Sequence, residues 1–135
     1  MTDQRKSIRP LIPSISISEQ TSLAEQFQNE TLRPIIKLQH DLLIAIFKDY
    51  FKKSKQPFSD LAKEQQAVFV NQVFQKDIAF RNELCGVIIG QFTVEEYRQY
   101  AQSKSSYNKR LKDIIQQRII SNLELFAWLS ILFEN

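Results

Sequence analysis

The sequence is poor in residues that break or cross-link a fold. Its 135 residues include 2 glycines, 4 prolines and one cysteine, Cys85. A many-stranded sheet needs more turn glycines than this, so the composition favours helices. A single cysteine excludes an intrachain disulfide and is typical of a reducing compartment. The 10 phenylalanines can fill a core. Together with the low glycine and proline content, they predict an all-α protein.

Histidine is almost absent as well, because His40 is the only one in the chain. A zinc site needs three or four nitrogen or sulfur ligands, and a di-iron bundle site needs Glu-x-x-His on two helices. Neither pattern occurs, and no second histidine could serve as the base for a nucleophile. The only glycines, Gly86 and Gly90, do not form a phosphate-binding loop. We therefore expect no metal, no cofactor and no catalytic residue.

Positive charge is only slightly in excess, with a net charge of +3. Nucleic-acid-binding domains usually concentrate more positive charge than this, so we expect no nucleic-acid partner. The chain has no apolar run of about 20 residues, which a membrane span requires. Its first apolar residues are interrupted by Pro10 and Pro13, unlike those of a signal peptide. These features predict a cytoplasmic protein.

The longest helical pattern covers about residues 31–53. Thr31 is suited to cap it, with Pro34 in the opening turn, where proline is tolerated. A single kinked helix from Glu19 to Lys53 is the competing interpretation. The apolar residues of the 31–53 segment recur at three- and four-residue steps, which places them on one face. They are Leu32, Ile35, Ile36, Leu42, Leu43, Ile46, Phe47 and Tyr50. We expect an irregular bundle of about five helices around this long central helix, in a single domain over residues 19–135.

Capping signals divide the rest of the chain. Asp77 is suited to cap one helix, for which Gly90 is the C-terminal stop, and Thr93 with Glu96 matches a capping box. Gly86 lies inside a predicted helix, where it costs roughly 1 kcal/mol relative to alanine. We therefore expect another helix to approach closely at Gly86. The predicted helices cover about 58–75, 77–90, 93–101 and 106 to the C-terminus.

The two ends of the chain differ in character. Residues 1–18 combine charges, two prolines and alternating isoleucines. They predict a flexible N-terminal arm, with a short extended segment on the domain surface as the alternative. The C-terminal segment 123–133 is apolar on nearly all sides, which is typical of a buried helix or of a contact with a partner or second copy. Its candidate interface residues are Trp128, Ile131 and Phe133.

Polar residues interrupt the apolar stripes of two predicted helices. Gln39 lies in the stripe of the long helix, with Arg33 and His40 at its edge. Arg118 and Asn122 lie in the stripe of the last helix. An unsatisfied buried amide costs on the order of 1–3 kcal/mol, and an unpaired buried arginine costs more. We therefore hypothesise that these groups form a polar site across the packed helices.

Such a site needs a carboxylate to balance the charge of Arg118. The candidate counterions are Asp41, Asp77 and Glu83. The site would act either as a polar network that fixes helix register or as a pocket for a small ligand. The basic run Lys104–Lys112 at the start of the last helix is either a solvated helix face or a contact for phosphate.

The chain resembles a family of short bacterial proteins that carry the label glyoxalase. The similarity rests on FQNETLRPIIKLQHDLL (Phe27–Leu43), KDIAFRNELCGVIIGQFTVEEY (Lys76–Tyr97) and NKR (Asn108–Arg110), and covers most of Phe27–Leu123. Lyase-type glyoxalases hold a metal with histidine and glutamate on paired βαβββ modules, and hydrolase-type enzymes use a THxHxDH string. This chain has one histidine and no such string, so no glyoxalase site residue is carried over.

Taken together, these features predict a non-enzymatic helical module for interaction or regulation. We expect a protein partner, or a second copy of the chain bound through the C-terminal helix. The alternative is a small-molecule binder or an enzyme that uses the region of Gln39, His40 and Arg118.

Overall fold

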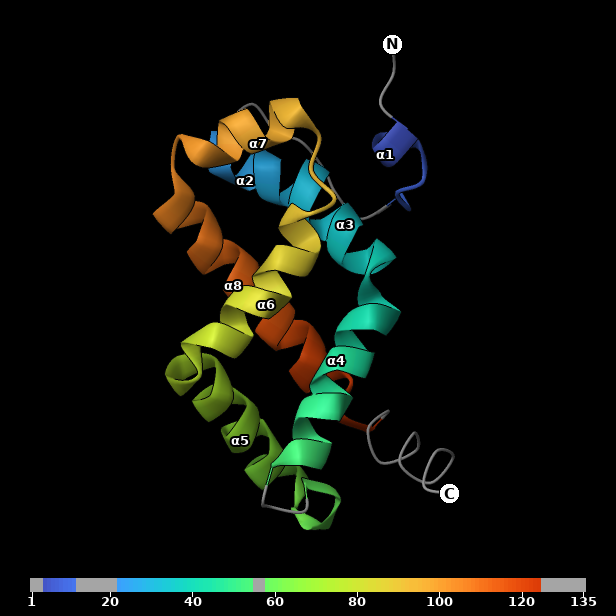
Figure 1. The fold of residues 1–135 in the computed structure, drawn as a ribbon, viewed down its shortest axis with the longest axis vertical. Helices are drawn as coiled ribbons and strands as arrows, with labels where there is room; N and C mark the ends of the chain where they lie inside the picture. Colours follow the sequence, from blue (N-terminus) through green and yellow to red (C-terminus); the bar gives the residue numbers. More distant parts are fainter. Residues whose placement is uncertain (1–3, 12–21, 55–57, 125–135) are drawn as a thin grey trace.

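The computed structural model describes residues 4–11, 22–54 and 58–124, and no strand occurs in these ranges. The predicted all-α class is confirmed (Figure 1). No helix in these ranges is both long and apolar enough to cross a bilayer. In chain order the elements are α1 (Gln4–Ser7), α2 (Leu23–Phe27), the π-helix η1 (Gln28–Leu32), α3 (Arg33–Leu38), α4 (His40–Lys53), the 3₁₀ turn η2 (Phe58–Asp60), α5 (Lys63–Lys76), α6 (Ile78–Ile89), α7 (Val94–Ala101) and α8 (Lys104–Ser121).

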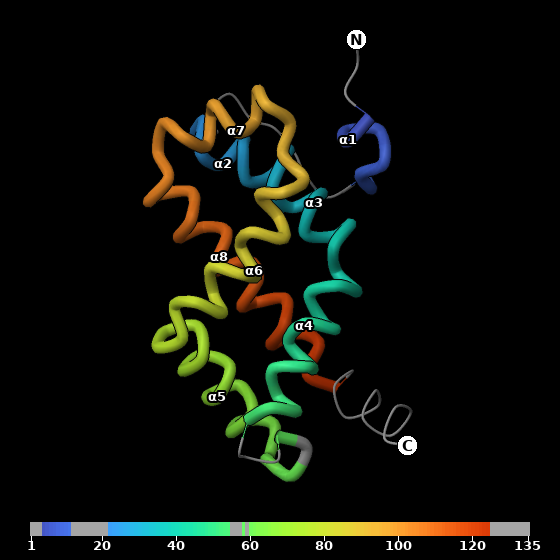
Figure 2. The backbone as a smooth tube through the Cα atoms, viewed as in Figure 1, coloured from blue at the N-terminus to red at the C-terminus, as the bar shows by residue number. Residues whose placement is uncertain are grey.

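Helices α6 and α8 cross near the middle of the molecule, as the ribbon and the backbone tube show (Figures 1 and 2). They contact each other, and α5 packs on both of them. Helix α4 packs on α6, and α7 packs on α8 at the end of the molecule where α2 lies. The crossing of α6 and α8 therefore sets the positions of the other long helices.

The core is one apolar cluster that draws on α2 to α8. Leu111, Ile115 and Ile119 of α8 are 0% exposed, and burying such a side chain contributes roughly 1.5–3 kcal/mol. Aromatic rings fill the end where α4 meets η2, and the rings of Phe51 and Phe58 stack with their centroids 3.7 Å apart. The large core predicted from the phenylalanine content is present.

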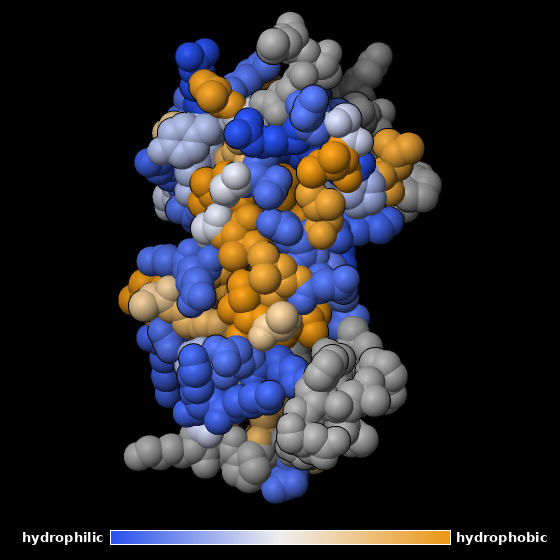
Figure 3. All heavy atoms as spheres, turned by 45° about the vertical axis from the view of Figure 1, so that its right-hand side comes forward, coloured by the Kyte–Doolittle hydropathy of each residue, from blue (hydrophilic) through white to orange (hydrophobic). Residues whose placement is uncertain are grey.

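Some apolar surface remains exposed. Figure 3 shows a band of it across the middle of one face, between hydrophilic areas. Over the whole described surface, the large apolar residues that are exposed are Ile8, Leu11, Leu23, Leu42, Val68, Ile78, Val94 and Tyr97.

The long helix predicted over about 31–53 is divided at Gln39. Helical turns run from Leu23 through η1 into α3, and α4 begins after Gln39, whose φ and ψ are −92° and 10°. Thr31 is not an N-cap, since it lies buried inside η1. That prediction was wrong, and the competing interpretation of a kinked helix is closer to the structure.

Pro34 accounts for the widened turn of η1. Proline has no N–H, so the carbonyl of Glu30 lacks its ordinary donor four residues on. The preceding turn is a π-helix, in which the N–H of Arg33 donates to the carbonyl of Gln28, five residues back. A turn of this kind aligns residues that are five apart, whereas an α-helix aligns residues four apart.

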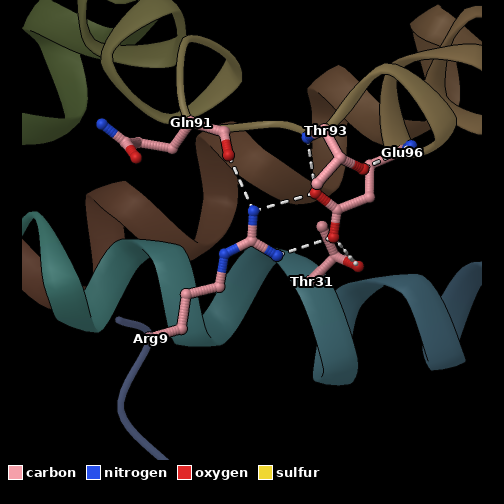
Figure 4. A network of polar contacts seen from close by, with 5 residues as sticks. All are labelled: Arg9, Thr31, Gln91, Thr93 and Glu96. Carbon is pink, nitrogen blue, oxygen red and sulfur yellow. Dashed lines mark hydrogen bonds and ion pairs between the residues drawn. The ribbon is translucent and has the colours of Figure 1, made fainter. Parts of the chain in front are cut away.

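A buried ion pair fixes the N-terminal segment to the domain (Figure 4). Arg9 donates from Nη1 to Glu96 Oε2 at 2.6 Å, and from Nη2 to Glu96 Oε1 at 2.9 Å and to the carbonyl of Gln91 at 2.7 Å. The side chains of Arg9 and Glu96 are 6% and 8% exposed. Within the arm predicted to be flexible over 1–18, this contact holds residues 4–11 against the domain, and the other residues of the arm lie outside the described ranges.

Glu96 also joins two further segments. The capping box predicted for α7 is confirmed, because the N–H of Thr93 donates to Glu96 Oε1 at 2.8 Å and the N–H of Glu96 donates to Thr93 Oγ1 at 3.1 Å. The hydroxyl of Thr31 in η1 donates to Glu96 Oε2 at 3.3 Å. One carboxylate therefore links the N-terminal segment, η1 and the start of α7.

The pKa of Glu96 follows from this network. Burial alone would raise it, but the hydrogen bonds from Arg9 and from the N–H of Thr93, with the charges of Arg9 and Lys6, lower it below the ordinary value. A lowered carboxyl pKa stabilises the fold above the ordinary value of about 4.3, and the stabilisation is lost as the pH falls through the folded-state pKa.

We predict that Glu96→Gln lowers the free energy of unfolding by roughly 1–3 kcal/mol at pH 7. This is less than for a typical buried pair, because Arg9 lies on a terminal segment and can return to water. Urea unfolding of both proteins from pH 7 to pH 3 measures it. The difference should shrink below about pH 4.3, and a difference that stays constant with pH would contradict the assignment.

Helix α6 begins and ends where predicted, but no other helix of the described ranges packs closely against Gly86. Asp77 caps α6, accepting from the N–H of Phe80 at 3.1 Å, and Gly90 is the C-cap. A Cβ added at Gly86 would meet nothing within 4 Å, and Gly86 is exposed. The predicted close approach of another helix at this position was wrong.

We therefore predict that Gly86→Ala stabilises the protein by about 0.5–1 kcal/mol, since alanine restricts the unfolded chain and favours the helix. Thermal and urea unfolding measure the change. Gly90→Ala is the matched control, because its Cβ would lie 3.2 Å from the carbonyl oxygen of Gly86 and should give a smaller gain or a loss. Equal gains at both positions, or none at Gly86, would contradict the packing described.

Candidate functional site: an arginine-lined groove

The rotation of α8 places a polar stripe beside its buried one. Leu111, Ile115 and Ile119 face the core at four-residue steps. Arg110, Ile114 and Arg118 follow the same spacing one position earlier, so their side chains lie on an adjacent stripe. None of these three is fully exposed, and Ile114 packs against the core.

The opposite wall comes from the π-turn and the start of α3. Gln28 and Arg33 are five residues apart, and the i→i+5 turn brings both to the side of α8. Gln28 Oε1 accepts from Arg110 Nη1 at 2.9 Å, which ties the wall to α8.

Between these walls lies a groove of about 710 Å³, which we call the arginine groove. Its size falls within the roughly 300–1,000 Å³ of ligand sites. Three arginines and one carboxylate supply its charged groups. Its lining residues are Gln28, Arg33, Arg110, Asp113, Ile114, Gln117, Arg118, Ser121 and Asn122.

Arg118 and Arg33 form one end of the arginine groove. Arg33 Nε donates to Asn29 Oδ1 at 3.2 Å, and Arg118 Nη1 lies 3.2 Å from His40 Nδ1. Neither guanidinium has a carboxylate within 4.0 Å in the part of the chain that the structure describes. Burial, and then the nearby charge of Arg33, lower the pKa of Arg118. Among the residues that the structure describes, this end of the groove is therefore positive with no paired carboxylate.

His40 supports Arg118 from α4. A guanidinium only donates hydrogen bonds, so His40 Nδ1 must accept and the ring proton must be on Nε2. Burial and the charge of Arg118 lower the pKa of His40, and Asp41 opposes them. The neutral ring is therefore the form that holds the Arg118 side chain.

The structure brings together most, but not all, of the polar residues predicted as a site. Arg33, Arg118 and Asn122 line the groove, and His40 contacts Arg118. Asn122 Nδ2 donates to the carbonyl of Arg118 at 2.6 Å. Gln39 lies elsewhere: its amide is 3.5 Å from the carbonyl of Val87, near the end of α6.

The three candidate counterions do not form an ion pair with Arg118. Asp77 accepts from the hydroxyl of Tyr50 at 2.8 Å while capping α6. Asp41 acts on the pKa of His40 and has no ion pair with Arg118, and Glu83 lines a different pocket, beside Tyr50.

Six of the lining residues were not among the predicted site residues, and two of these, Arg110 and Gln28, are bonded to each other across the groove. Arg110 belongs to the basic run Lys104–Lys112, and its eight-residue spacing from Arg118 was the available signal that both share one face of α8. Gln28 gave no signal, since only the π-turn before Pro34 turns it toward α8.

Other chemistry has little support in the described ranges. No group of three or more histidine, cysteine, aspartate or glutamate side chains there could hold a metal ion. Cys85 is buried, and burial raises the pKa of its thiol to about 11. The candidate interface residues Trp128, Ile131 and Phe133 lie outside the described residues, so self-association through them stays a prediction.

We predict that His40 titrates below the ordinary histidine value of about 6.5. Because it is the only histidine, its ring signals in a proton NMR titration need no assignment. Arg118→Gln should raise its pKa by removing a like charge, and Asp41→Asn should lower it further. A pKa at or above 6.5, or one that Arg118→Gln leaves unchanged, would contradict the contact.

The arginine groove is thus defined by its own residues and their charges. Comparisons with protein-family models, with curated proteins and with solved structures found no match to this chain.

Proposed function

We propose that this protein is a non-enzymatic binding module that takes an anionic group, a carboxylate or a phosphate, in the arginine groove. The observation that carries the proposal is the half-buried guanidinium of Arg118, which lies near Arg33 and has no carboxylate partner in the described ranges. We further propose that it acts in the cytoplasm, as the single cysteine favours.

The electrostatics support this proposal. Two like charges near each other in a partly buried site raise the energy of the free protein. An anion bound there would relieve the repulsion and restore the hydrogen bonds that burial removes. A hydrogen bond to a charged group is worth about 1.5–3 kcal/mol, so one bidentate contact supports measurable affinity.

The donor geometry supports an oxyanion in particular. Guanidinium groups present a planar fork that matches carboxylate and phosphate oxygens. His40 and Asn29 already orient Arg118 and Arg33, which reduces the entropy lost on binding. The groove also contains the amides of Gln117 and Asn122, which can donate to a bound group.

The test is titration calorimetry with inorganic phosphate in low-salt buffer, at constant ionic strength. We expect binding to the native protein and at least 10-fold weaker binding to Arg118→Gln, which corresponds to about 1.4 kcal/mol. Lys109→Gln is the matched control, because it makes the same charge change on the exposed side of α8.

Equal losses in Arg118→Gln and Lys109→Gln would reveal unspecific screening and would contradict the proposal. Absence of phosphate binding to the native protein would contradict it too. No residue group in the described ranges favours a second function, including glyoxalase chemistry.

A further inference from the structure

The arginine groove has two positive ends. Arg110, bonded to Gln28, forms one end, and Arg118 with Arg33 forms the other. Arg110 and Arg118 are eight residues apart on α8, which at 1.5 Å per residue separates them by roughly 12 Å. A single carboxylate or phosphate reaches only one end, so the groove has a second anion contact that the proposed function leaves unused.

The stretch between the ends is not positive. Ile114 lies halfway along it and packs partly into the core. Asp113 lies beside it, exposed, with Lys112 Nζ 3.6 Å from its Oδ1. An acidic group in the middle of the groove would meet the carboxylate of Asp113, whereas an apolar side chain would meet Ile114.

We infer that the ligand is an extended peptide segment of a partner protein, with acidic side chains at positions i and i+4 and an apolar side chain at i+2. In an extended chain these three side chains lie on one face. At about 3.3 Å per residue, positions i and i+4 are roughly 13 Å apart, which is close to the rise of roughly 12 Å along α8 from Arg110 to Arg118. The inference rests on the proposed function, because it needs the groove to bind anions.

The charge pattern favours such a peptide over a nucleic acid. A nucleic-acid strand carries a phosphate at every nucleotide, so it would also place a negative charge against Asp113 and Ile114. A peptide can leave the middle position uncharged. The side-chain amide of Gln117, on the same lining, can bond to the peptide backbone.

The inference is tested by fluorescence anisotropy with labelled synthetic peptides and the full chain at 150 mM salt. The test peptide contains Glu-Ser-Leu-Ser-Glu in a neutral Gly-Ser context. One control has the two glutamates adjacent, a second has them three residues apart, and a third replaces one glutamate by glutamine. We expect the test peptide to bind at least 10-fold tighter than any control.

Variants then locate the two ends. Arg110→Gln and Arg118→Gln should each weaken the test peptide at least 10-fold, and Lys109→Gln should change it less than twofold. In the arginine variant that lacks the partner of the replaced glutamate, the peptide with one glutamine should bind nearly as well as the test peptide, because that contact is already lost. In the other arginine variant it should bind more weakly than the test peptide, because both contacts are then lost. The comparison of peptides with different glutamate spacings uses only the native protein. A variant that fails to fold therefore does not affect this part of the test.

Each result separates the two proposals. If phosphate binds but peptide spacing has no effect, the peptide inference is overturned and the anion site remains. If a linear small dicarboxylate of similar length competes as well as the test peptide, the inference that the ligand is a segment of a partner protein is overturned. If neither phosphate nor any peptide binds, both proposals fail.

Discussion

The buried stripe of α8 is the constraint on which the rest of the structure depends. Leu111, Ile115 and Ile119 are fully buried on a helix that packs against α5 and α6, so the helix cannot rotate without exposing them. Their burial fixes the direction of every other residue on α8. Arg110 and Arg118 face the groove because the residues next to them are buried in the core. Their direction is therefore set by helix packing and does not depend on a hydrogen bond to either arginine.

The opposite wall is held by groups far from the groove. Because Pro34 has no backbone N–H, the turn before it is a π-turn. This turn directs Gln28 and Arg33 toward α8. The carboxylate of Glu96 anchors that turn through Thr31 and receives Arg9 from the N-terminal segment. The network of Figure 4 and the arginine groove are thus parts of one arrangement: the first positions η1, and η1 carries one wall of the second.

Some features that depend only on neighbouring residues were predictable from the sequence, although the cap expected at Thr31 is not present. The caps at Asp77 and Thr93 depend only on the capping side chain and the backbone N–H three residues further on. The polar stripe residues Arg33 and Arg118 stood out against their apolar surroundings. Contacts between distant segments gave no such signal. The partner of Arg9 lies 87 residues away, and Gln39 bonds toward α6 rather than α8. The sequence indicated that these polar groups need partners, but the choice of partner depends on how the helices pack.

The most direct test of the arginine groove is an NMR titration that follows the Nε–Hε signals of the arginine side chains as phosphate is added. We expect the signals of Arg33 and Arg118 to shift together and saturate, while that of Arg98, exposed on α7, stays in place. Unsaturable shifts of equal size at all three arginines would contradict it, since they would show an unspecific ion atmosphere in place of a site.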